Sequence, residues 1–240
     1  MKIIICKDYV EMSSLAAERV AKTVKEKPNC TLGLATGSTP VEMYEKLVEK
    51  YNAGELDFSR VKTFNLDEYY PISPKNENSY RRFMEENLFG KVNIKPENIA
   101  FPNGNAEDAN KECKRYEKLI SEGEGIDLQI LGIGQNGHIG FNEPADALDL
   151  YVHLTSLNES TIKANSRFFA SESEVPKQAV TMGMKDILSA RSIILLANGK
   201  EKHDAVKALL DEKVSANVPA SFIKLHSNAC VICDREAYYG

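Results

Sequence analysis

The chain passes from a strand-like to a helical pattern within the stretch Cys30-Thr-Leu-Gly-Leu-Ala-Thr-Gly-Ser-Thr-Pro40. Its first half is apolar, its second half is a turn of small residues, and Pro40 stands near the first position of a helix, where proline is tolerated. The same order recurs along the chain. Strand-like runs occur at residues 1–6, 30–36, 61–66, 128–132, 192–197, 221–224 and 229–233, and helical patterns at residues 9–25, 40–51, 79–88, 106–120, 176–188 and 201–210. This alternation predicts an α/β fold with an open, mostly parallel, doubly wound (Rossmann-like) sheet and helices on both faces.

Length and composition are those of a globular protein. The 240 residues are 42% hydrophobic and 27% charged, which argues against a disordered or low-complexity chain. No Pro/Gly/Ser linker or internal repeat divides the sequence, so we expect one domain over residues 1–240. The run at residues 1–6 predicts a buried strand and is too short for a signal peptide or a membrane span. We therefore expect a cytoplasmic protein.

Charge and cysteine usage narrow the possible functions. A net charge of −5 opposes nucleic-acid binding, which needs a dominant basic face, so an anionic ligand must be held by local positive groups. The five cysteines are widely spaced, which suits a reducing compartment. Cys230 and Cys233 lie three residues apart on one predicted strand, so their thiols should point to opposite faces. We expect core thiols rather than a metal or redox site, because no second Cys/His pair has ligand spacing.

Three segments that follow predicted strands carry the candidate chemistry, because ligands of open α/β sheets bind at the carboxyl ends of the strands. The first is the turn of residues 36–39. Its free amides and the hydroxyls of Thr36, Ser38 and Thr39 suit a phosphate at a helix N-terminus. The Gly-Lys-Ser/Thr core of a Walker A loop is missing, so nothing points to a nucleoside triphosphate with magnesium. Similar turns are also common in folds that bind nothing there.

The second segment, residues 61–70, leads from a predicted strand into two acidic residues. Asp67 and Glu68 follow the carboxyl edge of that strand, where a carboxylate can project over the ligand crevice. Shielding from water tunes a carboxylate toward the pKa that proton abstraction at neutral pH requires. One of the two is therefore a candidate base, and the alternative is a solvated acidic turn.

The third segment, residues 126–144, leaves a predicted strand and enters a polar loop rich in glycine. Residues 132–137 match the form of the dinucleotide fingerprint G-x-G-x-x-G. That fingerprint must open a long helix, whereas the residues that follow show no helical period and end in Pro144. We therefore reject a dinucleotide site.

The same loop carries an imidazole with two polar neighbours. Histidine is the residue type whose side chain changes charge near neutral pH, so the imidazole of His138 suits proton transfer. Asn136 and Glu143 are able to fix its tautomer and orientation. A lone loop histidine is more often structural, but this one stands where ligands bind, so we favour a functional role.

Four motifs occur together, and they are Thr36-Gly-Ser-Thr-Pro40, Phe64-Asn-Leu-Asp-Glu-Tyr69, Gly137-His-Ile-Gly-Phe-Asn-Glu-Pro144 and Ala164-Asn-Ser-Arg-Phe-Phe169. In order and approximate spacing they resemble the glucosamine-6-phosphate deaminase (isomerase) family, and the resemblance covers essentially the whole chain. It implies a hydrolase with an isomerase-like mechanism, acting in amino sugar (N-acetylglucosamine) catabolism. Such an enzyme converts D-glucosamine 6-phosphate and water into D-fructose 6-phosphate and ammonia, without a metal or organic cofactor.

Carried over residue by residue, the resemblance implies two groups of functional side chains. Asp67 is implied as the base that shuttles a proton, while His138, with Glu143 and Asn136, serves the opening of the sugar ring. Contacts to the substrate phosphate are implied for Gly37, Ser38, Thr39, Arg167 and Lys202.

Two departures from the best-known branch of the family shape the expectations. That branch has an aspartate at position 136, whereas Asn136 cannot stabilise an imidazolium by a full charge, so Glu143 is the only carboxylate left for that task. Allosteric hexamers of the family have basic and hydroxyl residues after the Asn-Glu-Pro loop and an extended C-terminus, which this sequence lacks. We therefore expect a monomer or small homo-oligomer without activation by N-acetylglucosamine 6-phosphate.

Two other functions remain open from the sequence. A 6-phosphogluconolactonase has a related fold and a Gly-His loop, although its loop typically continues into Thr-Ala-Ser instead of residues 141–144. A sugar-phosphate-sensing module, such as the effector domain of a transcriptional regulator, needs only the phosphate turn, and no length is left for a helix-turn-helix. In each case the expected partner is a small sugar phosphate, with no nucleic acid and no membrane.

Several further features are ambiguous in the sequence. The Ser/Asn-rich residues 158–171 are a candidate lid over the substrate. Tyr69 and Tyr70 suit either the crevice or the core. We expect His203 and His226 to be ordinary surface or packing residues.

Overall fold

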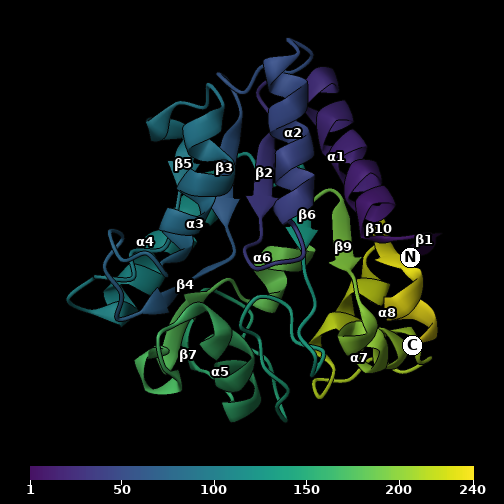
Figure 1. Ribbon diagram of the computed structural model, residues 1–240. Coiled ribbons are helices and arrows are strands. Elements are labelled where there is room, and N and C mark those ends of the chain that lie inside the picture. Colours follow the sequence, from purple (N-terminus) through teal and green to yellow (C-terminus); the bar gives the residue numbers. More distant parts are fainter.

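A computed structural model describes all residues 1–240 and builds them around a seven-stranded parallel sheet (Figure 1). The spatial order of its strands is β1-β10-β9-β6-β2-β3-β5, and every neighbouring pair is parallel. The strands are β1 (Lys2–Cys6), β2 (Thr31–Leu34), β3 (Lys62–Asn65), β5 (Ile99–Ala100), β6 (Leu128–Leu131), β9 (Ile193–Ala197) and β10 (Ala229–Asp234). The predicted open, mostly parallel sheet is thus confirmed.

Helices cover both faces of this sheet, as predicted. They are α1 (Tyr9–Glu26), α2 (Val41–Asn52), α3 (Tyr80–Asn87), α4 (Ala109–Glu122), α5 (Glu159–Asn165), α6 (Met184–Leu188), α7 (His203–Leu210) and α8 (Arg235–Tyr239). Alternate strand residues point to opposite faces, so Ile194 packs with α1 and α2 in one core, whereas Leu195 packs with α4, α6 and α7 in the other. Cys230 and Cys233 also belong to different cores, which confirms that their thiols point to opposite faces.

A second, smaller sheet was not predicted. It is antiparallel, in the order β4-β8-β7, and consists of β4 (Asp67–Tyr70), β8 (Gln178–Thr181) and β7 (His153–Ser156). Leu66 joins the two sheets, because its N–H donates to the carbonyl of Leu34 in β2 and its carbonyl accepts from Met182. Asp67 is therefore the first residue of a new strand rather than part of a turn at the edge of β3.

Three sequence-based predictions of local structure were wrong. Residues 176–188, predicted as one helix, form β8 and then the short α6, because the first half pairs with β4 and β7. The apolar residues 221–224 lie in a 3₁₀ helix, η6 (Pro219–Leu225), instead of a strand. The strand β1 lies at the edge of the sheet, and Ile3 and Ile5 on its outer side are 41% and 38% exposed, so it is not a buried strand.

Short 3₁₀ helices complete the chain, and they are η1 (Phe89–Lys91), η2 (Pro96–Asn98), η3 (Ser166–Phe168), η4 (Glu172–Glu174), η5 (Lys200–Lys202) and η6. Two of them, η3 and η5, carry cationic side chains near the site described below. Among the helices, none combines the length and the apolar character that crossing a lipid bilayer requires.

Candidate active site

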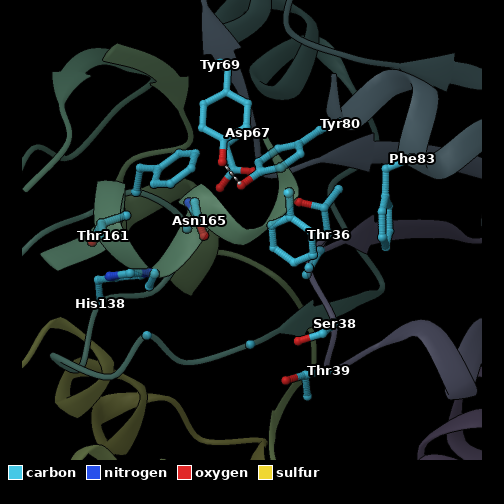
Figure 2. A pocket seen from close by; sticks show the side chains of 18 of the residues that line it. Thr36, Ser38, Thr39, Asp67, Tyr69, Tyr80, Phe83, His138, Thr161 and Asn165 are labelled. Atoms are coloured by element: carbon cyan, nitrogen blue, oxygen red, sulfur yellow. Dashed lines mark hydrogen bonds between the residues drawn. The ribbon is translucent and has the colours of Figure 1, made fainter. Parts of the chain in front are cut away.

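A pocket of about 240 Å³ lies beyond the carboxyl ends of β2, β3 and β6 (Figure 2). Residues of α3, α5, η3 and η5 complete its walls. The structure brings nearly all candidate residues of the sequence to this one pocket, and they are Gly37, Ser38, Thr39, Asp67, Asn136, His138, Arg167 and Lys202. Glu143 does not line the pocket and lies behind His138.

We call one side of the pocket the reaction end and define it by Asp67, Tyr69, Tyr80 and Phe141. Asp67 is 6% exposed, and no protein group donates a hydrogen bond to its carboxyl. Burial, with a smaller contribution from the charge of neighbouring Glu68, raises the pKa of Asp67 to about 8. The side chain is therefore a free carboxyl that holds its proton more tightly than an ordinary aspartate.

Glu68 differs from Asp67 in every contact. Its carboxylate accepts the backbone N–H groups of Tyr69, Tyr80 and Arg81 at 3.0, 2.8 and 2.9 Å. It does not line the pocket. Of the two acidic residues that the sequence offered as a base, only Asp67 reaches a ligand.

Aromatic rings enclose the reaction end. Tyr69 lies between Tyr80, Phe141 and Phe169, with ring centroids 4.6, 5.7 and 5.7 Å away. The hydroxyl of Tyr80 donates to that of Tyr69 at 3.2 Å. Figure 2 shows the side chains of Asp67, Tyr69 and Tyr80 pointing toward one another. These rings exclude water from the carboxyl, which is the physical cause of its raised pKa.

The imidazole of His138 lies on a tight loop after β6. Gly134 permits this loop, because a Cβ on Gly134 would lie 2.2 Å from the imidazole ring. Nδ1 of His138 is 3.4 Å from Oε2 of Glu143. Burial tends to raise the pKa of Glu143, but the His138 imidazole and the hydrogen bond from Asn136 outweigh it and lower that pKa to about 2. Glu143 is thus a fixed negative charge behind the imidazole.

Asn136 makes no hydrogen bond to the imidazole ring and instead bonds to the groups around it. Its Nδ2 donates to Oε2 of Glu143 at 2.8 Å, and its Oδ1 accepts the backbone N–H of His138 at 3.2 Å. Asn158, at the start of α5, adds a second amide donor to Oε2 of Glu143 at 3.2 Å. Two amides therefore hold the carboxylate that faces the imidazole.

We call the opposite side the anchor end and define it by the turn of residues 37–39, Arg167 and Lys202. Gly37 has φ +97°, which favours glycine and turns the chain toward α2. Thr39 donates to the side chain of Asn198 at 2.7 Å, and the guanidinium of Arg167 donates to the Ser38 hydroxyl at 3.1 Å.

The anchor end is positively charged, and no carboxylate is hydrogen-bonded to its two cationic side chains. Burial lowers the pKa of Lys202, and the positive charge of Arg167 lowers it further, against an opposing effect of Glu201. Two cations in one partly enclosed place make a favourable site for an anion, because an anion relieves their mutual repulsion. No cluster of three or more His, Cys, Asp or Glu side chains suited to a metal ion occurs in the structure.

Sequence reasoning missed some residues of the pocket. Tyr80 and Phe83 of α3 and Thr161 of α5 line it, and nothing in their local sequence marks them. The candidate lid, residues 158–171, supplies one wall of the pocket. Tyr69 lines the pocket, whereas Tyr70 donates to the carbonyl of Ala106 and packs in the second core.

Comparisons with known proteins agree on one family. The model of the family described as glucosamine-6-phosphate isomerases/6-phosphogluconolactonase matches residues 9–232. Two proteins named glucosamine-6-phosphate deaminase, from Thermoanaerobacter sp. (strain X514) and Clostridioides difficile (strain 630), are each 53% identical to this chain. The aligned 237 residues cover 99% of this chain and 94% and 95% of those proteins.

Solved structures show the same likeness. The structure of a monomeric glucosamine-6-phosphate deaminase superposes with a TM-score of 0.97 at 46% identity, covering 99% of this chain and 98% of that one. A 6-phosphogluconolactonase from Thermotoga maritima superposes with a TM-score of 0.75 at 25% identity, covering 98% and 99%.

Proposed function

Since this chain belongs to the family of glucosamine-6-phosphate isomerases and 6-phosphogluconolactonases, we propose that it is a glucosamine-6-phosphate deaminase. It converts D-glucosamine 6-phosphate and water into D-fructose 6-phosphate and ammonia. The observation that carries this function is the presence, in one pocket, of the free buried carboxyl of Asp67 and the carboxylate-backed imidazole of His138. The deaminases that align over 99% of this chain support the same reaction.

The first step is the opening of the sugar ring. The closed pyranose must lose a proton from its anomeric hydroxyl and gain one on its ring oxygen. An imidazole can both accept and donate a proton, which suits both transfers, and His138 is partly exposed to the pocket. The fixed charge of Glu143 stabilises the imidazolium that forms between the two transfers.

The second step moves a proton between two carbons. In the open aldehyde, the carbonyl at C1 acidifies the hydrogen on C2, and the carboxylate of Asp67 removes it. O1 takes a proton from the adjacent substrate ammonium, which gives an enolamine. Asp67 then returns a proton to C1 and a ketimine forms. Water adds to C2 of the ketimine and ammonia leaves, so that the product is the 2-ketose.

The substrate itself prepares Asp67 for this role. The free carboxyl has a pKa of about 8, so it is mainly protonated at neutral pH. The substrate amino group sits on C2, next to the hydrogen that is removed. When it is an ammonium, its charge favours the carboxylate form of Asp67, as an opposite charge within a few ångströms does.

The phosphate does not react and serves as an anchor. The amides of the 37–39 turn, the guanidinium of Arg167 and the ammonium of Lys202 supply charge-assisted hydrogen bonds to it. This arrangement places the sugar carbons toward the reaction end. The resemblance to family motifs and the shared pocket support these roles.

We also propose a single domain over residues 1–240 that acts as a monomer or small homo-oligomer. The contacts of Leu66 with both sheets support one folding unit. The likeness to a monomeric deaminase supports the small assembly. Analytical ultracentrifugation, together with rate curves that are hyperbolic with and without N-acetylglucosamine 6-phosphate, tests this proposal.

An assay of the purified protein tests the function. With glucosamine 6-phosphate it should release ammonium and form fructose 6-phosphate in equal amounts. With 6-phosphogluconolactone it should not exceed the spontaneous hydrolysis rate. Lactone hydrolysis without ammonium release would assign the chain to the other activity of the family.

A further inference from the structure

A second buried acid stands beside Asp67, and the steps above do not use it. Glu68 is 2% exposed. Successive residues of a strand point to opposite faces, so Asp67 faces the pocket while Glu68 faces the N-terminus of α3. The Cγ of Glu68 packs closely on Gly104, so that a Cβ added to Gly104 would lie 2.9 Å from this Cγ.

Glu68 holds the beginning of α3. The first four N–H groups of a helix lack partners within the helix. In α3, the N–H groups of Tyr80 and Arg81 bond to the Glu68 carboxylate, and that of Arg82 bonds to the Ser79 hydroxyl at 3.0 Å. The N–H of Ser79, the N-cap residue, bonds to the Asn76 carbonyl at 3.1 Å. A buried side chain of β4 thus supplies half of these partners.

This cap fixes the ring that covers Asp67. Tyr80 is the first residue of α3, so the hydrogen bond from its N–H to Glu68 sets where its side chain begins. Its ring stacks on Phe141, with centroids 5.9 Å apart and planes inclined by 10°, and its hydroxyl reaches Tyr69. In Figure 2 the Tyr80 side chain extends toward Asp67.

We propose, on the basis of the proposed function, that Glu68 is a positioning residue for the deamination: it binds the start of α3, holds Tyr80 over Asp67 and keeps the reaction end closed to water. The carboxylate of Glu68 touches neither substrate nor reacting atoms. It acts through the placement of Tyr80 and through its own charge.

No protein cation is bonded to either carboxyl. The charged and titratable neighbours from the surrounding elements are Tyr69, Tyr80, Arg81 and Tyr116. The guanidinium of Arg81 lies over the rings of Phe89 and Phe101 at 5.8 and 5.9 Å. The strand β8 faces the two carboxyls with Thr181 and Val180, which carry no charge.

The two acids therefore divide their roles by environment. Burial raises the pKa of Glu68 to about 7, while the three N–H groups act in the opposite direction. Asp67 has no such donors, and the charge of Glu68 adds to the effect of burial. Glu68 is the acid that carries the negative charge, and Asp67 is the one that keeps its proton until substrate arrives.

The test compares pH profiles of kcat/KM for ammonium release in the wild type and in Glu68→Gln. The amide can still accept from Tyr80, but it removes the charge and the bond to Arg81. The acid limb of the Glu68→Gln profile should lie about one pH unit below that of the wild type, since loss of a nearby negative charge lowers the pKa of a carboxyl. The KM of the variant should stay within about threefold of the wild-type value. Titration of the substrate itself is common to both proteins and cancels in the comparison.

Ser79→Ala is the matched control, because it removes the cap bond to Arg82 at the same helix end but leaves the charge of Glu68 and its bond to Tyr80 in place. Its acid limb should coincide with that of the wild type. A Glu68→Gln limb that also coincides overturns the proposal. If Glu68→Gln does not fold, Tyr80→Leu decides: a downward shift supports the shielding role, and an unmoved limb contradicts it.

A failure of the proposed function is distinguishable from a failure of this inference. In the first case the wild type releases no ammonium. The Asp67 carboxyl is then titrated directly by ¹³C NMR in the wild type and in Glu68→Gln. A lower midpoint in the variant supports the role of Glu68, and equal midpoints overturn it.

Discussion

The two ends of the pocket have opposite physical character. At the reaction end, Asp67 is buried among aromatic rings and has no hydrogen-bond donor, so a charge there is costly. At the anchor end, Arg167 and Lys202 and the amides of a glycine turn offer donors and positive charge to an anion. The reaction end raises the pKa of the base, and the anchor end holds the substrate. Chemistry and binding should therefore be separable by mutation, with kcat changing at one end and KM at the other.

The largest expected effect is at the reaction end. Asp67→Asn keeps the shape of the side chain but removes the base, so kcat should fall by about 10²–10⁴-fold, the usual worth of a general acid/base. KM should change little, because the anchor end is intact. Ammonium release under steady-state conditions measures both constants.

Asp186→Asn is the control for that variant. Asp186 is also buried and has a pKa raised to about 7, chiefly by burial, but it lies in α6 and does not line the pocket. It should retain nearly wild-type kcat. An Asp67→Asn variant as active as Asp186→Asn would refute the assignment of the base.

The next largest effect concerns the ring-opening step. Glu143→Gln leaves His138 without a carboxylate, so the imidazolium formed during ring opening is less stable, and kcat should fall by about 10–100-fold. Glu112→Gln changes another buried acid, which pairs with Arg115 outside the pocket, and should leave kcat near the wild-type value. Equal rates in the two variants would show that Glu143 has no part in ring opening.

The anchor end should respond in KM. Arg167→Ala removes a charge-assisted hydrogen bond to phosphate, worth about 1.5–3 kcal/mol, so KM should rise by about 10–100-fold while kcat changes less than about threefold. Arg191→Ala, which removes a surface arginine paired with Asp127, should leave both constants unchanged. A loss of kcat with unchanged KM in Arg167→Ala would break the separation of the two ends.

The smallest effect is on stability. The folded pKa of Asp67, about 8, lies above the ordinary value of 3.8, so between those values the unfolded chain releases a proton that the folded protein keeps. Stability due to this group therefore falls as pH rises from about 4 to 8. Asp67→Asn removes that penalty, so it should be more stable than the wild type, and the gain should be larger at pH 8 than at pH 5 by on the order of a few kcal/mol. Thermal unfolding at both pH values checks it, and an equal gain at both would contradict the raised pKa.

The contrast between the two ends also explains what the sequence could predict. The anchor turn follows β2 and opens α2, and both elements have clear local periodicity, so its place was predictable. His138 and Glu143 stand in one loop, so their proximity was predictable from spacing. The local residues marked Asp67 and Glu68 as candidate bases without distinguishing them, and the resemblance to the family motifs singled out Asp67.

The enclosure of the reaction end depends on contacts that no local pattern encodes. The strands β4, β7 and β8 have four residues each and form only by pairing with one another. The placement of Tyr80 depends on its bond to Glu68, twelve positions earlier in the chain. Residues 176–188 have a helical pattern over their length, yet partner strands draw the first half into β8. In these regions, pairing between distant strands determines the secondary structure, rather than intrinsic propensity.

Isotope tracing in the wild type tests the central claim most directly. Glucosamine 6-phosphate deuterated at C2 should give ammonium and fructose 6-phosphate, with the label found on C1 or in the solvent. Asp67→Asn should release the label from C2 about 10²–10⁴-fold more slowly. A product that is still an aldose and retains deuterium on C2 would contradict proton abstraction by Asp67.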